Sequence, residues 1–201
     1  MSSSELLPLH RVVVDEFVST YNLIVSFYSS GGGGSKGIEE GKRLTVSQAI
    51  LPPYLKLSSV GTEDPIDADS LFTVILSDPD APSRTDPKFG EFLHFLMVNC
   101  KASDLYGTGE VLTSYHGPSP GPGSGEHRYC FVVYAQPSGR IECDEAKIGS
   151  QSGFPPRRMF KQRAFAAKYG LIPVAAVSWI TEHDDAQPFM AAKIQGLAPP
   201  E

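Results

Sequence analysis

The sequence is poor in cysteine and in long apolar runs, and these shortages count against several classes of protein. Its three cysteines, Cys100, Cys130 and Cys143, form no CxxC pair, and an odd number of thiols fits reduced side chains better than a disulfide framework. No stretch reaches the roughly 18 apolar residues of a membrane span, so membrane contact is expected to be peripheral at most. Residues 1–10 lack the basic start and apolar centre of a secretory signal, so the predicted location is cytoplasmic.

Positive charge is also scarce. Lys and Arg number 17 against 23 Asp and Glu, which gives a formal net charge of −6. A general nucleic-acid binder needs a basic face, so no direct nucleic-acid partner is expected. The nucleotide-binding pattern G-x-x-x-x-G-K-[ST] is absent, and no two histidines have the spacing H-x-x-x-H. No cofactor or metal is therefore predicted, although a metal site built from distant Asp and His side chains stays chemically open.

Glycine and proline, in contrast, are abundant. The chain of 201 residues has 19 glycines and 17 prolines, well above their usual combined share of about 12%. This excess favours a β-rich fold with many turns over a helix bundle. The hydrophobic fraction of 41% is sufficient for one core, and no repeat or second core is evident, so we predict a single domain over 1–201.

Apolar runs predict the strands of a mostly antiparallel β domain. Four continuous runs are typical of buried strands, at 71–76, 92–98, 129–135 and 173–180. The β-branched segment 12–17 and the alternating segment 21–28 predict two further strands, and 44–58 predicts short strands and turns.

Helices are predicted only near the C-terminus. One spans 157–169, with Phe160, Ala164 and Ala167 on one face and Gly170 after its end. A second, short helix is predicted at about 188–194. The helices are expected to be peripheral to the β core.

Polar residues with chemical potential stand beside the apolar runs. Asp78 and Asp80 follow the first run, His94 lies inside the second, and His127 comes two residues before the third. The loop 117–125 is rich in Gly and Pro, which lets the backbone approach an anion closely and loses little entropy on binding. These features together favour a binding site, although each one alone is more often structural.

A serine nucleophile is not predicted. The segment 117–121 has the spacing G-x-S-x-G around Ser119, but hydrolases of that kind use the backbone N–H of the residue after the serine. Here that residue is Pro120, which has no N–H. An enzyme acting on phosphoesters would need a nucleophile or a metal that the sequence does not reveal. We therefore predict no catalytic residue and no enzymatic activity.

Four segments resemble the phosphatidylethanolamine-binding protein family, which includes the Raf kinase inhibitor proteins. They are 78–82 (DPDAP), Glu91-x-x-His94, 117–120 (GPSP) and 125–129 (GEHRY), and the resemblance extends over about 10–195. It implies a large antiparallel sheet packed on a smaller one, with helices at the C-terminal end. It also implies cis peptide bonds at Ala81-Pro82, where a proline makes cis accessible, and at Gly90-Glu91.

The resemblance further implies a small pocket for phosphate or a phosphoethanolamine head group. The ligand-binding residues that it implies are Asp78, Asp80, Phe89, Phe92, His94, Gly117, Pro120, His127, Tyr129 and Met190. Phe89 and Phe92 stand where relatives often have Tyr and Trp, so Phe92 cannot donate an indole N–H. The predicted function is that of a non-catalytic binding protein that regulates a kinase, a serine protease or another signalling protein.

A protein–protein module, whose pocket takes a phosphorylated or acidic side chain of its partner, is the alternative function. In either case we expect neighbouring carboxylates to raise the pKa of His94 and His127. Charged imidazoles would then bind the anion, and binding would weaken as the pH rises from about 6 to 9.

Overall fold

The computed structural model describes residues 9–27, 37–61 and 66–184, and it has two sheets. A six-stranded sheet has the order β2-β8-β7-β4-β5-β6, and β1 and β3 form a two-stranded antiparallel sheet. All neighbours in the large sheet are antiparallel except β2 and β8. The strands are β1 Tyr21–Ser26, β2 Lys42–Arg43, β3 Tyr54–Ser59, β4 Leu71–Asp78, β5 Phe92–Lys101, β6 Glu110–Thr113, β7 His127–Ala135 and β8 Ile172–Thr181.

Helical segments are short. Within the described residues, the α-helices are α1 Leu105–Thr108 and α2 Gln162–Lys168, and the 3-10 segments are η1 Leu9–Val12 and η2 Pro155–Arg157. No helix among the described residues is long and apolar enough to cross a membrane. The three cysteines are free thiols.

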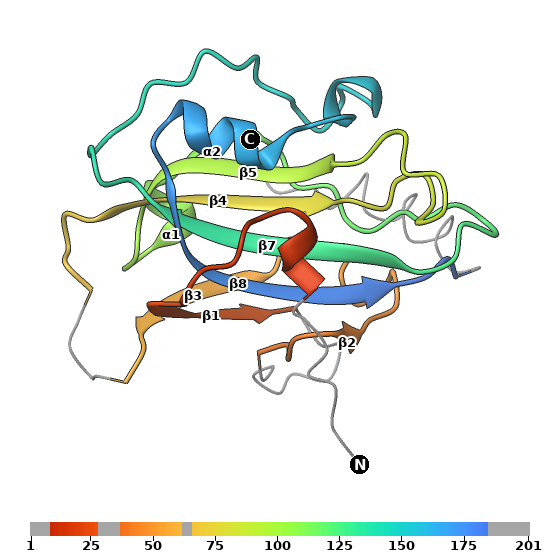
Figure 1. The fold of residues 1–201 in the computed structure, drawn as a ribbon, viewed down its shortest axis with the longest axis horizontal. Helices are drawn as coiled ribbons and strands as arrows, with labels where there is room; N and C mark the ends of the chain where they lie inside the picture. The colour runs from red at the N-terminus through yellow and green to blue at the C-terminus, as the bar shows by residue number, and fades with distance from the viewer. Residues whose placement is uncertain (1–8, 28–36, 62–65, 185–201) are drawn as a thin grey trace.

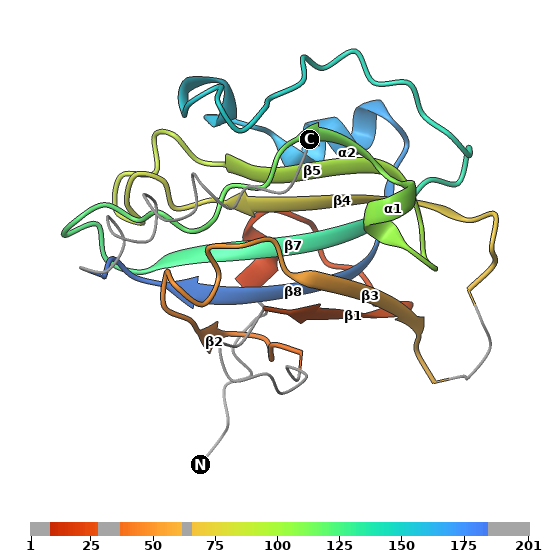
Figure 2. The ribbon, with the colours of Figure 1, turned by 180° about the vertical axis from the view of Figure 1, so that it is seen from behind.

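Both faces of the large sheet are covered, which explains why its central strands are apolar without alternation. On one face, side chains of β4 and β7 such as Phe72 and Phe131 pack with Val25 and Leu57 of the small sheet. On the other face, Ile75 and Val132 belong to a second cluster with Val13 and Val14, which follow η1, and with residues of α2. Figure 1 shows α2 and η1 in front of the large sheet, and Figure 2 shows the small sheet from the opposite side.

The predicted fold class is confirmed, as are the four buried strands, which are β4, β5, β7 and β8. The predicted strand at 12–17 is wrong, because the segment follows the 3-10 turn η1 and has no strand partner. Val13 and Val14 are buried against the sheet face, but the carbonyls of Arg11 and Val12 accept hydrogen bonds from the Arg163 side chain. The β-branched residues of this segment pack in the core and do not join a strand of the sheet.

The predicted helix at 157–169 begins later, at Gln162. Met159 has a φ of 60°, and its N–H donates to the carbonyl of Phe89, so the chain before α2 is held by the loop that leads into β5. The buried face of α2 consists of Gln162, Phe165 and Ala166. The expected face with Ala164 and Ala167 is wrong, since both are exposed. The helix predicted at 188–194 lies outside the described residues.

The loop between β4 and β5 has the two cis peptide bonds that the family resemblance implied, Ala81-Pro82 and Gly90-Glu91. Gly90 is required there by close packing, because a Cβ at this position would lie 2.3 Å from the carbonyl oxygen of Pro79. The loop therefore folds back tightly on the end of β4, and Asp80 contacts Arg128 at the start of β7.

Candidate functional site

Strand ends from three neighbouring strands bring the predicted polar residues together. Asp78 ends β4 and pairs in register with Phe92, which begins β5, while His127 begins β7. Because the strands are antiparallel, these ends meet at one edge of the sheet. Asp78, His94, His127 and Tyr129 are all buried there, between 1% and 3% exposed. The structure brings Asp78, His94, His127 and Tyr129 of the predicted set to this edge, and their role in binding stays a prediction.

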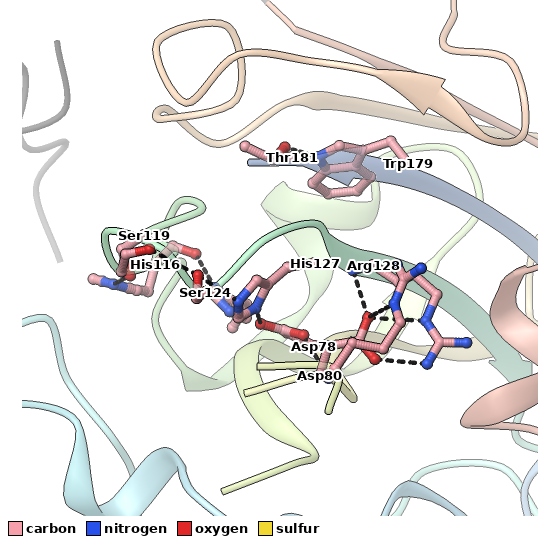
Figure 3. A network of polar contacts seen from close by, with 12 residues as sticks. Asp78, Asp80, His116, Ser119, Ser124, His127, Arg128, Trp179 and Thr181 are labelled. Atoms are coloured by element: carbon pink, nitrogen blue, oxygen red, sulfur yellow. Dashed lines mark hydrogen bonds and ion pairs between the residues drawn. The ribbon is translucent and has the colours of Figure 1, made fainter. Parts of the chain in front are cut away.

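Asp78 and His127 form a buried pair (Figure 3). Nδ1 of His127 lies 2.7 Å from Oδ2 of Asp78, and the other carboxylate oxygen accepts the N–H of Asp80 at 2.7 Å. Burial raises the pKa of Asp78. Burial alone would lower the pKa of His127, but the hydrogen bond and charge of Asp78 raise it above its ordinary value. The expected rise in the His127 pKa is confirmed, and this imidazole favours its charged form.

The second nitrogen of His127 contacts a serine of the glycine-rich loop. Nε2 lies 3.0 Å from Oγ of Ser124, so Asp78, His127 and Ser124 have the order of a hydrolase triad. The Ser124 hydroxyl also donates to the carbonyl of Gly121 at 2.8 Å, where it can act only as a donor. His127 therefore donates to Ser124 and does not act as its base in this arrangement.

His94 has the opposite electrostatic character. Its Nδ1 lies 2.7 Å from the carbonyl oxygen of His116, and the two imidazole rings stack with centroids 5.7 Å apart. Burial, followed by the charges of His116 and Arg157, lowers the pKa of His94 well below its ordinary value. The expected rise in the His94 pKa is wrong, because cationic groups rather than carboxylates surround this ring.

Arg157 adds to the positive potential around His94. It is 2% exposed, and its guanidinium donates to the carbonyls of Leu93 at 3.1 Å and Ser114 at 3.0 Å. Among the described residues, no carboxylate forms an ion pair with it. Burial lowers the pKa of Arg157 to about 10, so the guanidinium stays charged at neutral pH. A buried cation without an acidic partner is costly in a protein interior.

His116 and Phe154 complete the cluster beside His94. The His116 ring lies 5.2 Å from the Phe154 ring and 6.2 Å from the Phe92 ring, centroid to centroid. Nε2 of His116 is 3.1 Å from Oγ of Ser119. Burial and the charge of Arg157 lower the pKa of His116 to about 4, so this ring is neutral at physiological pH.

His116, Phe154 and Arg157 are absent from the predicted set. The position of His116 directly before the loop 117–125 was the one available signal. Arg157 gave none, because an arginine between a Pro pair and a second arginine has the pattern of a surface turn.

Asp80 belongs to a different contact. Its carboxylate accepts the backbone N–H, Nε–H and Nη2–H of Arg128 at 2.9, 2.9 and 2.6 Å (Figure 3). Burial opposes ionisation, but these bonds lower the pKa of Asp80 below its ordinary value. Asp80 therefore fixes the start of β7 rather than facing the histidines.

Three other residues of the predicted site make packing contacts or hydrogen bonds with other parts of the chain. The guanidinium of Arg158 stacks on the Phe89 ring, with its Cζ atom 4.0 Å from the ring centroid. A Cβ on Gly117 would lie 2.8 Å from the backbone of Ile50, so this glycine allows close packing of the loop. The carbonyl of Pro120 accepts a hydrogen bond from Nδ1 of His183 at 3.0 Å. Met190 lies outside the described residues.

A surface hollow of about 270 Å³ lies elsewhere, and none of the predicted site residues lines it. Its lining comes from β2, the end of β8 and their flanks: Arg43, Leu44, Thr45, Gln48, Ile180, Glu182, His183 and Asp184. Within 9–27, 37–61 and 66–184, no group of three or more His, Cys, Asp or Glu side chains could hold a metal ion.

Comparisons with known proteins agree with this geometry. Residues 34–188 match the family model described as phosphatidylethanolamine-binding protein. The chain is 33% identical over 177 residues to Protein MOTHER of FT and TFL1 homolog 2 from Oryza sativa subsp. japonica, covering 87% of this chain and 88% of the relative.

Two solved structures have the same fold. A carboxypeptidase Y inhibitor, complexed with the cognate proteinase, has a TM-score of 0.64 and 25% identity, and the match covers 84% of this chain and 86% of that chain. A phosphatidylethanolamine-binding protein from Plasmodium vivax has a TM-score of 0.62 and 20% identity, with 83% and 87% covered. Since the family model matches most of the chain and the fold agrees, the chain belongs to the phosphatidylethanolamine-binding protein family.

Proposed function

We propose that the chain is a non-catalytic binding protein whose histidine cluster takes phosphate or a phosphoethanolamine head group, and that it regulates a protein partner. The buried guanidinium of Arg157 carries the proposal. Its acceptors are carbonyl and hydroxyl oxygens, which leave its positive charge uncompensated. An anion bound beside it would supply the missing negative charge in a region of low dielectric constant.

The charges around the cluster support an anion rather than a cation. The Asp80 carboxylate is already paired with Arg128, and Arg84 lies 3.4 Å from it as a second cation. The Asp78 carboxylate is bonded to His127. Tyr129 keeps its phenolic proton because burial raises its pKa well above the ordinary value. The cluster therefore has no carboxylate left over to repel a phosphate group.

The loop 117–126 controls how a ligand reaches this cluster. Ser124 contacts Nε2 of His127, and Ser119 contacts Nε2 of His116, so both nitrogens are covered by the loop itself. Gly121, Pro122 and Gly123 between these serines are exposed. Displacement of Ser124 would free a charged N–H of His127 for a phosphate oxygen, which is a strong hydrogen bond.

Regulation of a partner is supported by the similarity to a protease inhibitor. The carboxypeptidase Y inhibitor was solved in complex with its proteinase, so a protease is one class of partner, and a kinase or another signalling protein is the other. A phosphorylated or acidic side chain of a partner would offer the same site the same chemistry. The three free thiols fit the reducing environment of the cytoplasm and support a cytoplasmic location.

Isothermal titration calorimetry with phosphoethanolamine tests the proposal on the wild type, on His127→Ala and on Ser138→Ala, an exposed serine in the turn after β7. Loss of one charge-assisted hydrogen bond of about 1.5–3 kcal/mol raises the Kd of His127→Ala by about 10- to 150-fold. Ser138→Ala binds as the wild type does. Absence of binding by the wild type, or an unchanged Kd in His127→Ala, refutes the proposed site.

A further inference from the structure

The two ring nitrogens of His94 are chemically different. Nδ1 lies 2.7 Å from the carbonyl oxygen of His116. A carbonyl oxygen only accepts, so Nδ1 carries a proton and donates it. Among the residues that the structure describes, Nε2 of His94 has no hydrogen-bond partner, although the side chain is 2% exposed. A buried imidazole thus has one nitrogen satisfied and the other free.

The surroundings of His94 keep Nε2 unprotonated. The titratable groups that face the ring are His116 from the loop after β6, Arg157 from η2, and His127 and Tyr129 from β7. The charges of Arg157 and His127 disfavour a second proton on the ring, as does burial. Asp78, the nearest carboxylate of the cluster, is bonded to His127 and not to His94. With Nδ1 protonated and the ring neutral, Nε2 presents a lone pair and accepts a hydrogen bond.

We propose that His94 makes the site selective for phosphate groups that carry a P–O–H, and against fully ionised oxyanions and phosphodiesters. The inference rests on the proposed function and deepens it. A lone pair on Nε2 repels a phosphate oxygen that has no proton and accepts a hydrogen bond from one that has. The monoester monoanion gains this bond, whereas a diester, which has the same charge, has no proton to donate.

The consequence concerns the natural ligand. The phosphate of an intact phosphatidylethanolamine is a diester without a P–O–H, and a free phosphoethanolamine head group is a monoester. His94 therefore favours the monoanion of the free head group, or of another phosphomonoester, over the head group of an intact lipid, and this monoanion prevails below about pH 6.

The test compares methyl phosphate with dimethyl phosphate by calorimetry at pH 5.5. Both are largely monoanions there, since the second pKa of a phosphomonoester is about 6, and they differ in one O–H against one O–CH3. We expect the wild type to bind methyl phosphate at least tenfold more tightly than dimethyl phosphate. At pH 8 methyl phosphate loses its proton and its affinity falls toward that of sulfate, while inorganic phosphate keeps an O–H and binds more tightly than both.

His94→Gln is the diagnostic variant, because its amide donates as well as accepts. The preference for methyl over dimethyl phosphate falls to less than threefold in His94→Gln. The matched control is His127→Gln, which weakens both probes and keeps the preference. Independently of any variant, nitrogen-15 NMR of the wild-type imidazoles reports a protonated Nδ1 and an unprotonated Nε2 for His94.

Each result decides one of the two proposals. Equal binding of methyl and dimethyl phosphate by the wild type overturns the selectivity and leaves the proposed function standing, as does a protonated Nε2. No binding of any phosphate probe overturns the proposed function and the selectivity with it.

Discussion

The contact between Asp80 and Arg128 provides the sharpest test of how the site is held together. The carboxylate is 2% exposed and the arginine side chain 22% exposed, and three N–H groups of Arg128 converge on the two carboxylate oxygens. Asp80→Asn keeps the shape but removes the charge and turns an amide NH2 toward the guanidinium. Breaking a buried ion pair on one side costs about 3–5 kcal/mol, and the partial exposure of Arg128 reduces this to about 2–4 kcal/mol.

Urea unfolding of the wild type and of Asp80→Asn measures this cost as a difference in the free energy of unfolding. For a domain of this size the same loss lowers the Tm by about 4–16 °C. Asp86→Asn is the matched control, since Asp86 forms an ion pair with Lys88 at 2.8 Å, with both side chains more than half exposed. That exposed pair is expected to contribute at most about 1 kcal/mol.

A double-mutant cycle separates the pair from its surroundings. Asp80→Asn combined with Arg128→Gln is less destabilised than the sum of the single variants, by about 1–3 kcal/mol. The contribution also depends on pH. Because the folded pKa of Asp80 is lowered, its stabilisation is present above the unfolded value of about 3.9 and is lost as the pH falls through the folded value. A loss below about 1 kcal/mol in Asp80→Asn, or an equal loss in Asp86→Asn, refutes this reasoning.

Three further predictions concern the histidines and the loop. Ser124→Ala, which removes the internal partner of His127, tightens inorganic phosphate binding about three- to tenfold by calorimetry; unchanged binding would show that Ser124 does not compete. Ester hydrolysis through Ser119 is absent, because Pro120 lacks the required N–H, and p-nitrophenyl acetate turnover lost only in Ser119→Ala would contradict this. The pKa values of His94 and His116 are lowered in the folded state, so the unfolded chain binds more protons and the free energy of unfolding falls as the pH drops from about 6.5 toward 4. His116→Asn makes this pH dependence weaker in urea titrations. An unchanged pH dependence in the variant would contradict the prediction.

Apolar continuity made the central strands predictable from the sequence. The run at Leu71–Asp78 is buried on both faces, so its composition alone identifies it. The segment 12–17 has a similar composition, but Arg163, about 150 residues later, takes the carbonyls that a strand would need. β-Branched content reports burial, and only tertiary context decides whether a ladder forms.

The charge state of His94 depends on a partner that the sequence does not reveal. Asp78 and Asp80, the carboxylates of the predicted site, each pair with a different cationic side chain, His127 and Arg128. Arg157 lies in a turn more than 60 residues later in the chain. It is buried beside the start of β5, where backbone carbonyls accept hydrogen bonds from its guanidinium. Local motifs were enough to predict which residues lie near one another, but the pKa of His94 depends on this contact with a residue distant in the sequence.

The two outer strands of the large sheet have a consequence for how copies of the chain meet one another. One edge is β2, only two residues long, both of them cationic and exposed. At the other edge, the backbone of β6 is covered by Ile148, whose N–H donates to Leu112 and whose carbonyl accepts from Ser114. Long, flat, unpaired edges are what recruit a neighbouring chain into continuous β-aggregates. Neither outer strand of the described large sheet is such an edge, so strand addition by a neighbouring chain is not expected at β2 or β6.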